Sequence, residues 1–117
     1  MLQITSQHKV LMAIEPVDFR RGIDGLRSIC MRQWKTDPFN GHVFVFKNKR
    51  STSVKILAYD GNGFWVCQKR FSQGKLKWWP KTAQDASSIR AVELMVVLQQ
   101  GVPMEAKIPE DWHRVER

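Results

Sequence analysis

The chain has 117 residues, of which 43% are hydrophobic and 26% charged, and its net charge is +8 at pH 7. This length predicts a single domain over 1–117, with a compact part at about 8–101 and a loosely packed tail at 102–117. No apolar run is long enough to cross a bilayer, and the N-terminus lacks the pattern of a signal peptide, so we expect a cytoplasmic protein without membrane partners.

A buried strand is the first predicted element, at 8–14, because it is a short apolar run that ends before Pro16. A helix capped by Asp18 is expected next. Apolar residues recur there every three or four positions and form one side of the helix: Phe19, Ile23, Leu26, Cys30 and Trp34.

Four runs typical of strands follow, at 42–47, 52–59, 64–71 and 75–80, with loops rich in Gly, Asn and Ser between them. The last predicted element is a buried helix within 87–101, capped by Ser87 or Ser88 and ended by Gly101. The predicted fold is therefore α+β, an antiparallel meander of about four to five strands with two helices packed on one face.

The positive charge is concentrated in the middle of the chain. Residues 41–83 contain nine basic residues and only one acidic residue, Asp60, whereas residues 84–117 contain four basic and six acidic residues. An unbalanced basic region attracts polyanions, although it can also serve solubility or meet an acidic protein partner. The turn at 47–51 is the sharpest cationic point, because a hairpin tip can follow a phosphate backbone.

Strand periodicity divides the side chains of this region between two faces, with Val54, Ile56 and Ala58 on one face and Ser53, Lys55, Leu57 and Tyr59 on the other. We expect helices on one face, and on the other Lys55, Lys69 or Arg70, and Lys77 among exposed aromatic rings. Such a face could attract phosphates and stack unpaired bases. The alternative is that the aromatic residues form the core and the lysines a solvated rim that protects edge strands from aggregation.

Catalytic and metal chemistry are not indicated. The two cysteines, Cys30 and Cys67, stand far apart among apolar residues, and the three histidines have no second ligand at helical or turn spacing. Six carboxylates could in principle build a two-metal centre: Asp18, Asp24, Asp37, Asp60, Asp85 and Glu93. Asp18, Asp37 and Asp60 are explained as a helix cap and two turn residues, so we predict no enzyme activity, no metal and no cofactor.

Three spaced blocks carry a family resemblance: "DFRRGIDGL" at 18–26, "DPFNGHVFVFKNKR" at 37–50 and "VKILAYDGNGFWVCQKRF" at 54–71. Together they resemble the accessory proteins called TnpB (open reading frame two) of the insertion-sequence-sixty-six family of bacterial transposable elements. The resemblance implies a small non-catalytic protein encoded beside a separate transposase and needed for efficient movement of the element. The positions that match the family motif include Asp18, Gly22, Asp24, Gly25, Asp60 and Gly61.

These observations together predict a transposition accessory protein that binds or positions DNA, either element ends or an exposed strand, for its transposase. The alternative is a protein-interaction module that docks on the transposase or another element-encoded protein without direct DNA binding. The candidate nucleic-acid-binding residues are Arg20, Arg21, Lys47, Lys49, Arg50, Lys55, Lys69, Arg70, Lys75 and Lys77.

Overall fold

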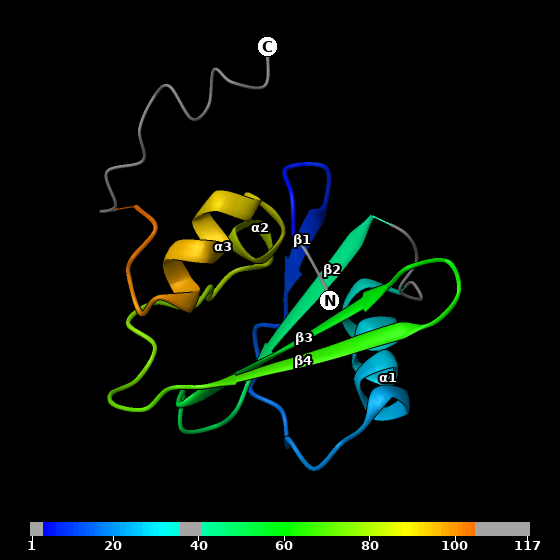
Figure 1. The fold of residues 1–117 in the computed structure, drawn as a ribbon, viewed down its shortest axis with the longest axis horizontal. Helices are drawn as coiled ribbons and strands as arrows, with labels where there is room; N and C mark the ends of the chain where they lie inside the picture. The colour runs from blue at the N-terminus through cyan, green and yellow to red at the C-terminus, as the bar shows by residue number, and fades with distance from the viewer. Residues whose placement is uncertain (1–3, 36–40, 105–117) are drawn as a thin grey trace.

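The computed structural model describes residues 4–35 and 41–104 (Figure 1). Asp37 and most of the predicted tail, from residue 105, lie outside the described residues. The elements in chain order are β1 (Lys9–Met12), α1 (Ile23–Trp34), β2 (His42–Lys47), β3 (Ser53–Tyr59), β4 (Phe64–Arg70), α2 (Ala83–Ser87) and α3 (Ala91–Leu98).

The four strands form one mixed sheet in the order β1-β2-β3-β4. The antiparallel meander predicted for 42–71 is confirmed, with β3 paired to both β2 and β4. However, β1 pairs with β2 in parallel. A parallel neighbour requires a crossover connection, and α1 provides it, so the first strand is not part of the meander.

The segment at 75–80 does not form the predicted strand. Its side chains and carbonyls are used in tertiary contacts: the indole Nε1 of Trp79 donates to the carbonyl of Ala13 at 2.7 Å, and the carbonyl of Lys75 accepts from the Gln100 amide at 3.2 Å. The strand-like composition here reflects apolar packing of Leu76 and Trp79 against the core rather than pairing in the sheet.

Helices cover both faces of the sheet (Figure 1). Leu26, Ile29 and Cys30 of α1 pack with Phe44 and Leu57 on one face. Leu94, Val97 and Leu98 of α3 pack against the other. The two predicted helices therefore lie on opposite faces, and the expected helix-free basic face does not exist. This explains the almost uninterrupted burial of β2 and β3, because strands covered on both sides are apolar throughout.

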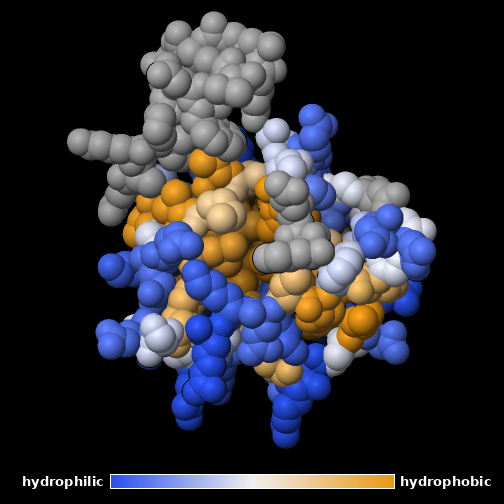
Figure 2. All heavy atoms as spheres, in the orientation of Figure 1, coloured by the Kyte–Doolittle hydropathy of each residue, from blue (hydrophilic) through white to orange (hydrophobic). Residues whose placement is uncertain are grey.

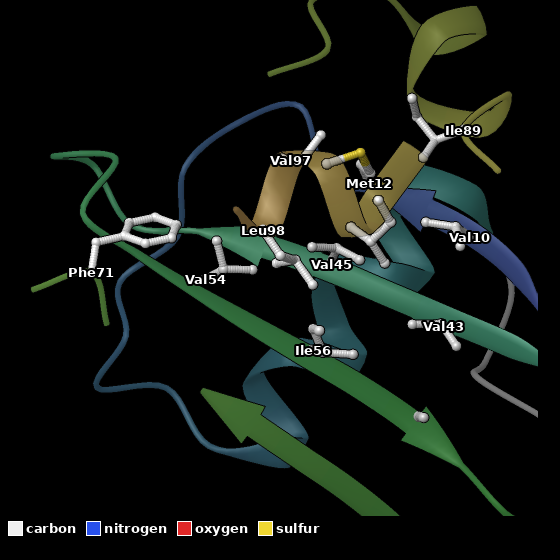
Figure 3. Packing of buried hydrophobic residues seen from close by; sticks show 12 residues of the cluster. Val10, Met12, Val43, Val45, Val54, Ile56, Phe71, Ile89, Val97 and Leu98 are labelled. Atoms are coloured by element: carbon white, nitrogen blue, oxygen red, sulfur yellow. The ribbon is translucent and has the colours of Figure 1, made fainter. Parts of the chain in front are cut away.

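Figure 3 shows the core between the sheet and α3, where Val97 and Leu98 of the helix approach Met12 of β1, Val45 of β2 and Ile56 of β3. Val54, Ile56 and Ala58 share this face, as the strand period predicts, while Leu57 belongs to the opposite core.

Both long helices begin later than predicted. Asp18 does not cap α1: its carboxylate accepts from the backbone N–H of Arg20 at 2.9 Å, which makes a local turn, and Gly22 is the N-cap. A short polar side chain that bonds its own backbone competes with helix formation, so the helix starts after this turn.

At α3 the N-cap is Arg90, whose backbone N–H donates to the Glu93 carboxylate at 3.0 Å. The predicted cap Ser87 instead ends α2. At the C-terminus of α3, Gly101 N–H donates to Val96 and Gln100 N–H to Val97, both at 2.9 Å, and Gln100 adopts φ 62°. This is a Schellman ending.

Candidate nucleic-acid interface

Three distant segments meet at the end of the sheet where β1 and β2 finish: 13–22, the β2–β3 turn at 48–52, and 71–81. Backbone hydrogen bonds join them to the sheet and to each other, from Val17 N–H to the Lys47 carbonyl at 2.9 Å and from Leu76 N–H to the Ser51 carbonyl at 2.9 Å. We call the cationic side chains of this end the basic edge: Arg20, Lys47, Lys49, Arg50, Arg70, Lys75, Lys77 and Lys81.

All of these residues except the half-buried Lys47 are exposed. Figure 2, drawn in the orientation of Figure 1, shows strongly hydrophilic side chains gathered along the lower rim of the molecule, where the β2–β3 turn and the segment after β1 lie. The acidic residues at this end among the described residues are Glu15, Asp18 and Asp85, against eight lysines and arginines, so cations predominate. A surface of this charge concentrates polyanions.

A hollow of about 920 Å³ opens between the segment 16–20 and the tip of the β2–β3 turn. Arg20, Lys49 and Arg50 lie around it, and Pro16, Val17 and Phe19 supply an apolar part of its lining. A second hollow of about 460 Å³, lined in part by Lys47, Lys77 and Lys81 together with Trp78 and Trp79, lies on the other side of the turn. The combination of cations with apolar walls suits a phosphate backbone that carries sugars and bases.

The β2–β3 turn is held by the side chain of Asn48. Its Oδ1 accepts from the backbone N–H groups of Thr52 at 2.9 Å and Ser53 at 3.1 Å, and its Nδ2 donates to Thr52 Oγ1 at 2.9 Å. Ser51, in the left-handed region at φ 60°, closes the turn. Lys49 is therefore presented on a fixed tip, which lowers the entropy lost when the tip contacts a ligand.

Lys55, predicted to bind phosphate, is buried in the structure and only 9% exposed. Its Nζ donates to the carbonyls of Phe19 at 2.7 Å and Arg21 at 3.2 Å, and it lies 5.1 Å from the centre of the Phe19 ring. The lysine thus holds the segment 18–21 in place from inside the molecule. Lys55 therefore positions the segment that carries Arg20, and its ammonium does not lie on the surface as predicted.

Arg20 is paired with the carboxylate of Asp18, with 2.7 Å between Nη2 and Oδ2. The hydrogen bonds from Arg20 lower the pKa of Asp18 to about 2, and the same contact raises the pKa of Arg20. The guanidinium side chain remains 92% exposed, so it has further donors available to a ligand.

Lys47 is the half-buried member of the basic edge, and its Nζ donates to Ser51 Oγ at 3.1 Å. Burial lowers its pKa, and the nearby Glu15 opposes that shift. This lysine supports the turn as well as contributing charge.

The remaining predicted residues separate into two groups. Arg70, Lys75 and Lys77 lie at the basic edge, as described above. Lys69 points to the α3 side, where its Nζ donates to the carbonyl of Leu98 at 2.6 Å, and Arg21 is exposed but lines neither of the two hollows. Sequence reasoning missed Lys81, whose position directly after Pro80 in the basic middle of the chain was the available signal.

Two of the family-motif residues, Asp60 and Gly61, form the turn between β3 and β4. Asp60 Oδ1 accepts from the backbone N–H groups of Asn62 at 3.0 Å and Gly63 at 2.8 Å, and its Oδ2 accepts from Trp65 Nε1 at 2.9 Å. These bonds, led by that from Gly63, lower the pKa of Asp60. Gly61 takes the positive φ of 91° that this turn requires. The Asp60 turn lies at the opposite end of the sheet from the basic edge.

Across residues 4–35 and 41–104, no three His, Cys, Asp or Glu side chains come close enough to hold a metal ion. The same part of the chain contains no helix long and apolar enough to span a membrane.

The fold and its basic edge define a small α+β protein with a polycationic surface. The chain belongs to the family of IS66 Orf2 like proteins, whose family model matches residues 8–108. It is 31% identical over 109 residues to the uncharacterized protein y4jC of Sinorhizobium fredii, an alignment that covers 93% of this chain and 85% of that protein. It is also 28% identical over 90 residues to y4hO of the same organism, covering 77% of each.

No solved structure matches the chain. Membership of the family confirms the resemblance seen in the three sequence blocks, and it implies a transposition-associated accessory role. The fold places the three sequence blocks relative to one another. The first block and the end of the second, around Arg20 and Lys49, line one hollow, whereas the turn of the third block lies at the far end of the sheet.

Proposed function

We propose that the protein binds DNA through the basic edge and positions it for the separately encoded transposase, without a chemical step of its own. The observation that carries this proposal is the convergence of Arg20, Lys49 and Arg50, from segments far apart in the sequence, around one hollow at an end of the sheet where cations predominate.

Binding would be driven by phosphate neutralisation. Each phosphate that a lysine or arginine neutralises releases condensed counterions, so the logarithm of affinity should fall with the logarithm of salt concentration by about 0.9 per contact on duplex DNA. Four or more contacts at the basic edge therefore correspond to a slope of about −4 or steeper. The apolar lining supplied by Val17 and Phe19 gives the hollow a surface for a sugar or an unpaired base.

The test is a binding titration with labelled single-stranded and double-stranded DNA, including element ends, across a salt series. Lys49→Ala/Arg50→Ala should weaken binding at least tenfold and reduce the salt slope by about 2, with an unchanged melting temperature. A matched control is Lys9→Ala/Arg32→Ala, which removes the same charge from exposed residues remote from the basic edge. Equal losses in the two double variants would contradict a localised site, and absence of binding at low salt would overturn the proposal.

Direct contact with the transposase is a second candidate, because the chain exposes several large apolar side chains. Met31 of α1 is 45% exposed, Met95 of α3 is 48% exposed and Met104 is 64% exposed. Exposed methionines suit adaptable protein contacts. Copurification with the transposase that survives nuclease treatment would support this candidate, and loss of the complex under nuclease would contradict it.

A further inference from the structure

The outer edge of β4 offers unpaired backbone groups. Asp60 N–H donates to the Gly63 carbonyl and Phe71 N–H to the Thr52 carbonyl, which fixes the hydrogen-bonded positions of the β3–β4 ladder. Because these positions alternate along an antiparallel pair, the even-numbered residues of β4 direct their N–H and C=O groups away from β3. No contact among the described residues satisfies these outward groups: Phe64, Val66, Gln68 and Arg70.

This edge has few of the features that protect edge strands. The seven residues of β4 pair with β3 without a bulge, and the strand contains no proline. Trp65 is 41% exposed and Val66 is 37% exposed. Lysines are the usual protection, but the ammonium of Lys69 is bound to the carbonyl of Leu98 in its own chain. An unbulged, partly apolar edge of this length is a template for another strand.

We infer that β4 pairs antiparallel with β4 of a second copy of this chain, about a two-fold axis at Cys67. The outward N–H and C=O groups of one copy must bond those of the other copy, so even-numbered residues of one β4 must lie opposite even-numbered residues of its partner. The register centred on Cys67 satisfies this condition and uses all seven residues of the strand. Val66 then forms hydrogen-bonded pairs with Gln68, and Phe64 with Arg70, joining two four-stranded sheets into one.

The strand is complementary to itself in this direction, because its first half is aromatic and its last half is cationic. Antiparallel pairing places Phe64 opposite Arg70 and Trp65 opposite the stem of Lys69, which are favourable cross-strand neighbours. A parallel arrangement would instead bring the cations of the two copies together. The sequence of β4 therefore favours a second copy, in antiparallel orientation, as its partner.

Cys67 provides a direct marker of this register. It faces its own copy at a non-hydrogen-bonded position, where opposite Cα atoms lie about 4.5 Å apart, within the range that a disulfide spans. Cys67 is partly exposed, whereas Cys30 is fully buried in the core on the α1 side. A neighbouring register would shift the two sulfurs to a diagonal relation and prevent the disulfide.

The first experiment measures mass by light scattering over a concentration series and disulfide formation with a mild oxidant. We expect twice the chain mass of 13.7 kDa, and a cross-linked dimer in the native protein and in Cys30→Ser but not in Cys67→Ser. Cys67→Ser should keep the doubled mass without oxidant. A single-chain mass at every concentration overturns the inference, and so does a dimer that oxidant does not link through Cys67.

The second experiment weakens the interface. Val66→Lys adds two cations beside the axis and should raise the dissociation constant at least tenfold. The matched control Met95→Lys makes the same change at an exposed apolar residue of α3 and should leave the mass unchanged. If Val66→Lys does not fold, Gln68→Pro replaces it, because this proline removes only an outward N–H. If the folded Val66→Lys or Gln68→Pro variant dimerises as tightly as the native protein, the inference is overturned.

This inference is independent of DNA binding, because the charge variant Lys49→Ala/Arg50→Ala should still form the dimer. Antiparallel pairing does, however, place the two basic edges at opposite ends of the joined sheet. A dimer that binds DNA would therefore present two separate binding surfaces.

Discussion

The two ends of the sheet are built by different kinds of contact. Each has a hairpin turn in which one side-chain oxygen accepts hydrogen bonds from two backbone N–H groups. The acceptor is Oδ1 of Asn48 at the basic edge and Oδ1 of Asp60 at the far end. The Asp60 turn is local, since its bonds, including that from Trp65, span no more than five residues.

The basic edge also depends on contacts between distant parts of the chain. Lys55 holds the segment 18–21, Trp79 donates to the carbonyl of Ala13, and the Gln100 amide donates to the carbonyl of Lys75. The cations of this edge are therefore placed by residues that add no exposed charge of their own. Changing those residues should alter DNA binding without removing any exposed charge.

Lys55→Met should have the largest effect, because it leaves the carbonyls of Phe19 and Arg21 without their donor. We expect a loss of about 3 kcal/mol in the free energy of unfolding, measured by denaturant titration. DNA affinity should fall while the salt slope stays the same. The matched variant Lys49→Met should reduce the slope and leave stability within about 0.5 kcal/mol. A reduced slope with full stability in Lys55→Met would show that this lysine contacts phosphate directly.

Asn48→Ala should come next, since it removes the acceptor of two backbone N–H groups in a partly buried turn. The expected loss is about 2 kcal/mol, together with weaker DNA binding because the tip is no longer fixed. Asn62→Ala in the far turn is the control, because its side chain is exposed and Asp60 holds that turn. Equal losses in the two variants would remove the distinction between the turns.

Trp79→Phe should cost about 1 kcal/mol, because it deletes the donor to the Ala13 carbonyl and keeps most of the apolar packing. Trp78→Phe, in the same hollow, serves as the matched control. We expect a lower melting temperature and a small loss of DNA affinity only for Trp79. No difference between the two would indicate that the indole bond does not support the edge.

Asp60→Asn should have the smallest effect at neutral pH, because an amide oxygen can still accept from Asn62 and Gly63. The folded-state pKa of Asp60 is lowered, so its stabilising contribution is present above the unfolded pKa and is lost as the pH falls through the folded value. The gap in melting temperature between variant and native protein should therefore narrow from about pH 6 to about pH 3. A constant gap would contradict this assignment, and DNA affinity should not change.

The sequence was most informative where structure is local. Alternation and turn composition predicted β2, β3 and β4 and assigned Ile56 and Leu57 to opposite faces, because a strand has a period of two residues whatever surrounds it. The Asp60 turn was predicted for the same reason. The middle of the chain was also correctly marked as the source of the positive charge at the basic edge.

The local sequence pattern gave wrong predictions where a residue has a partner that is distant in the sequence. The run at 75–80 has the composition of a strand, but Trp79 bonds to Ala13 instead. Lys55 has the type and spacing of a surface cation, but the segment 18–21 covers it and supplies its acceptors. Neither outcome can be read from neighbouring residues.

The sequence by itself therefore determined which residues form the meander, which side chains share a face, where positive charge accumulates and which family the three blocks resemble. Only the tertiary structure decided that β1 joins the sheet in parallel, that α1 and α3 cover opposite faces, and which lysines reach solvent. The physical reason is that strand period and turn chemistry act over a few residues, whereas covering a face or a lysine depends on segments that lie far apart in the sequence.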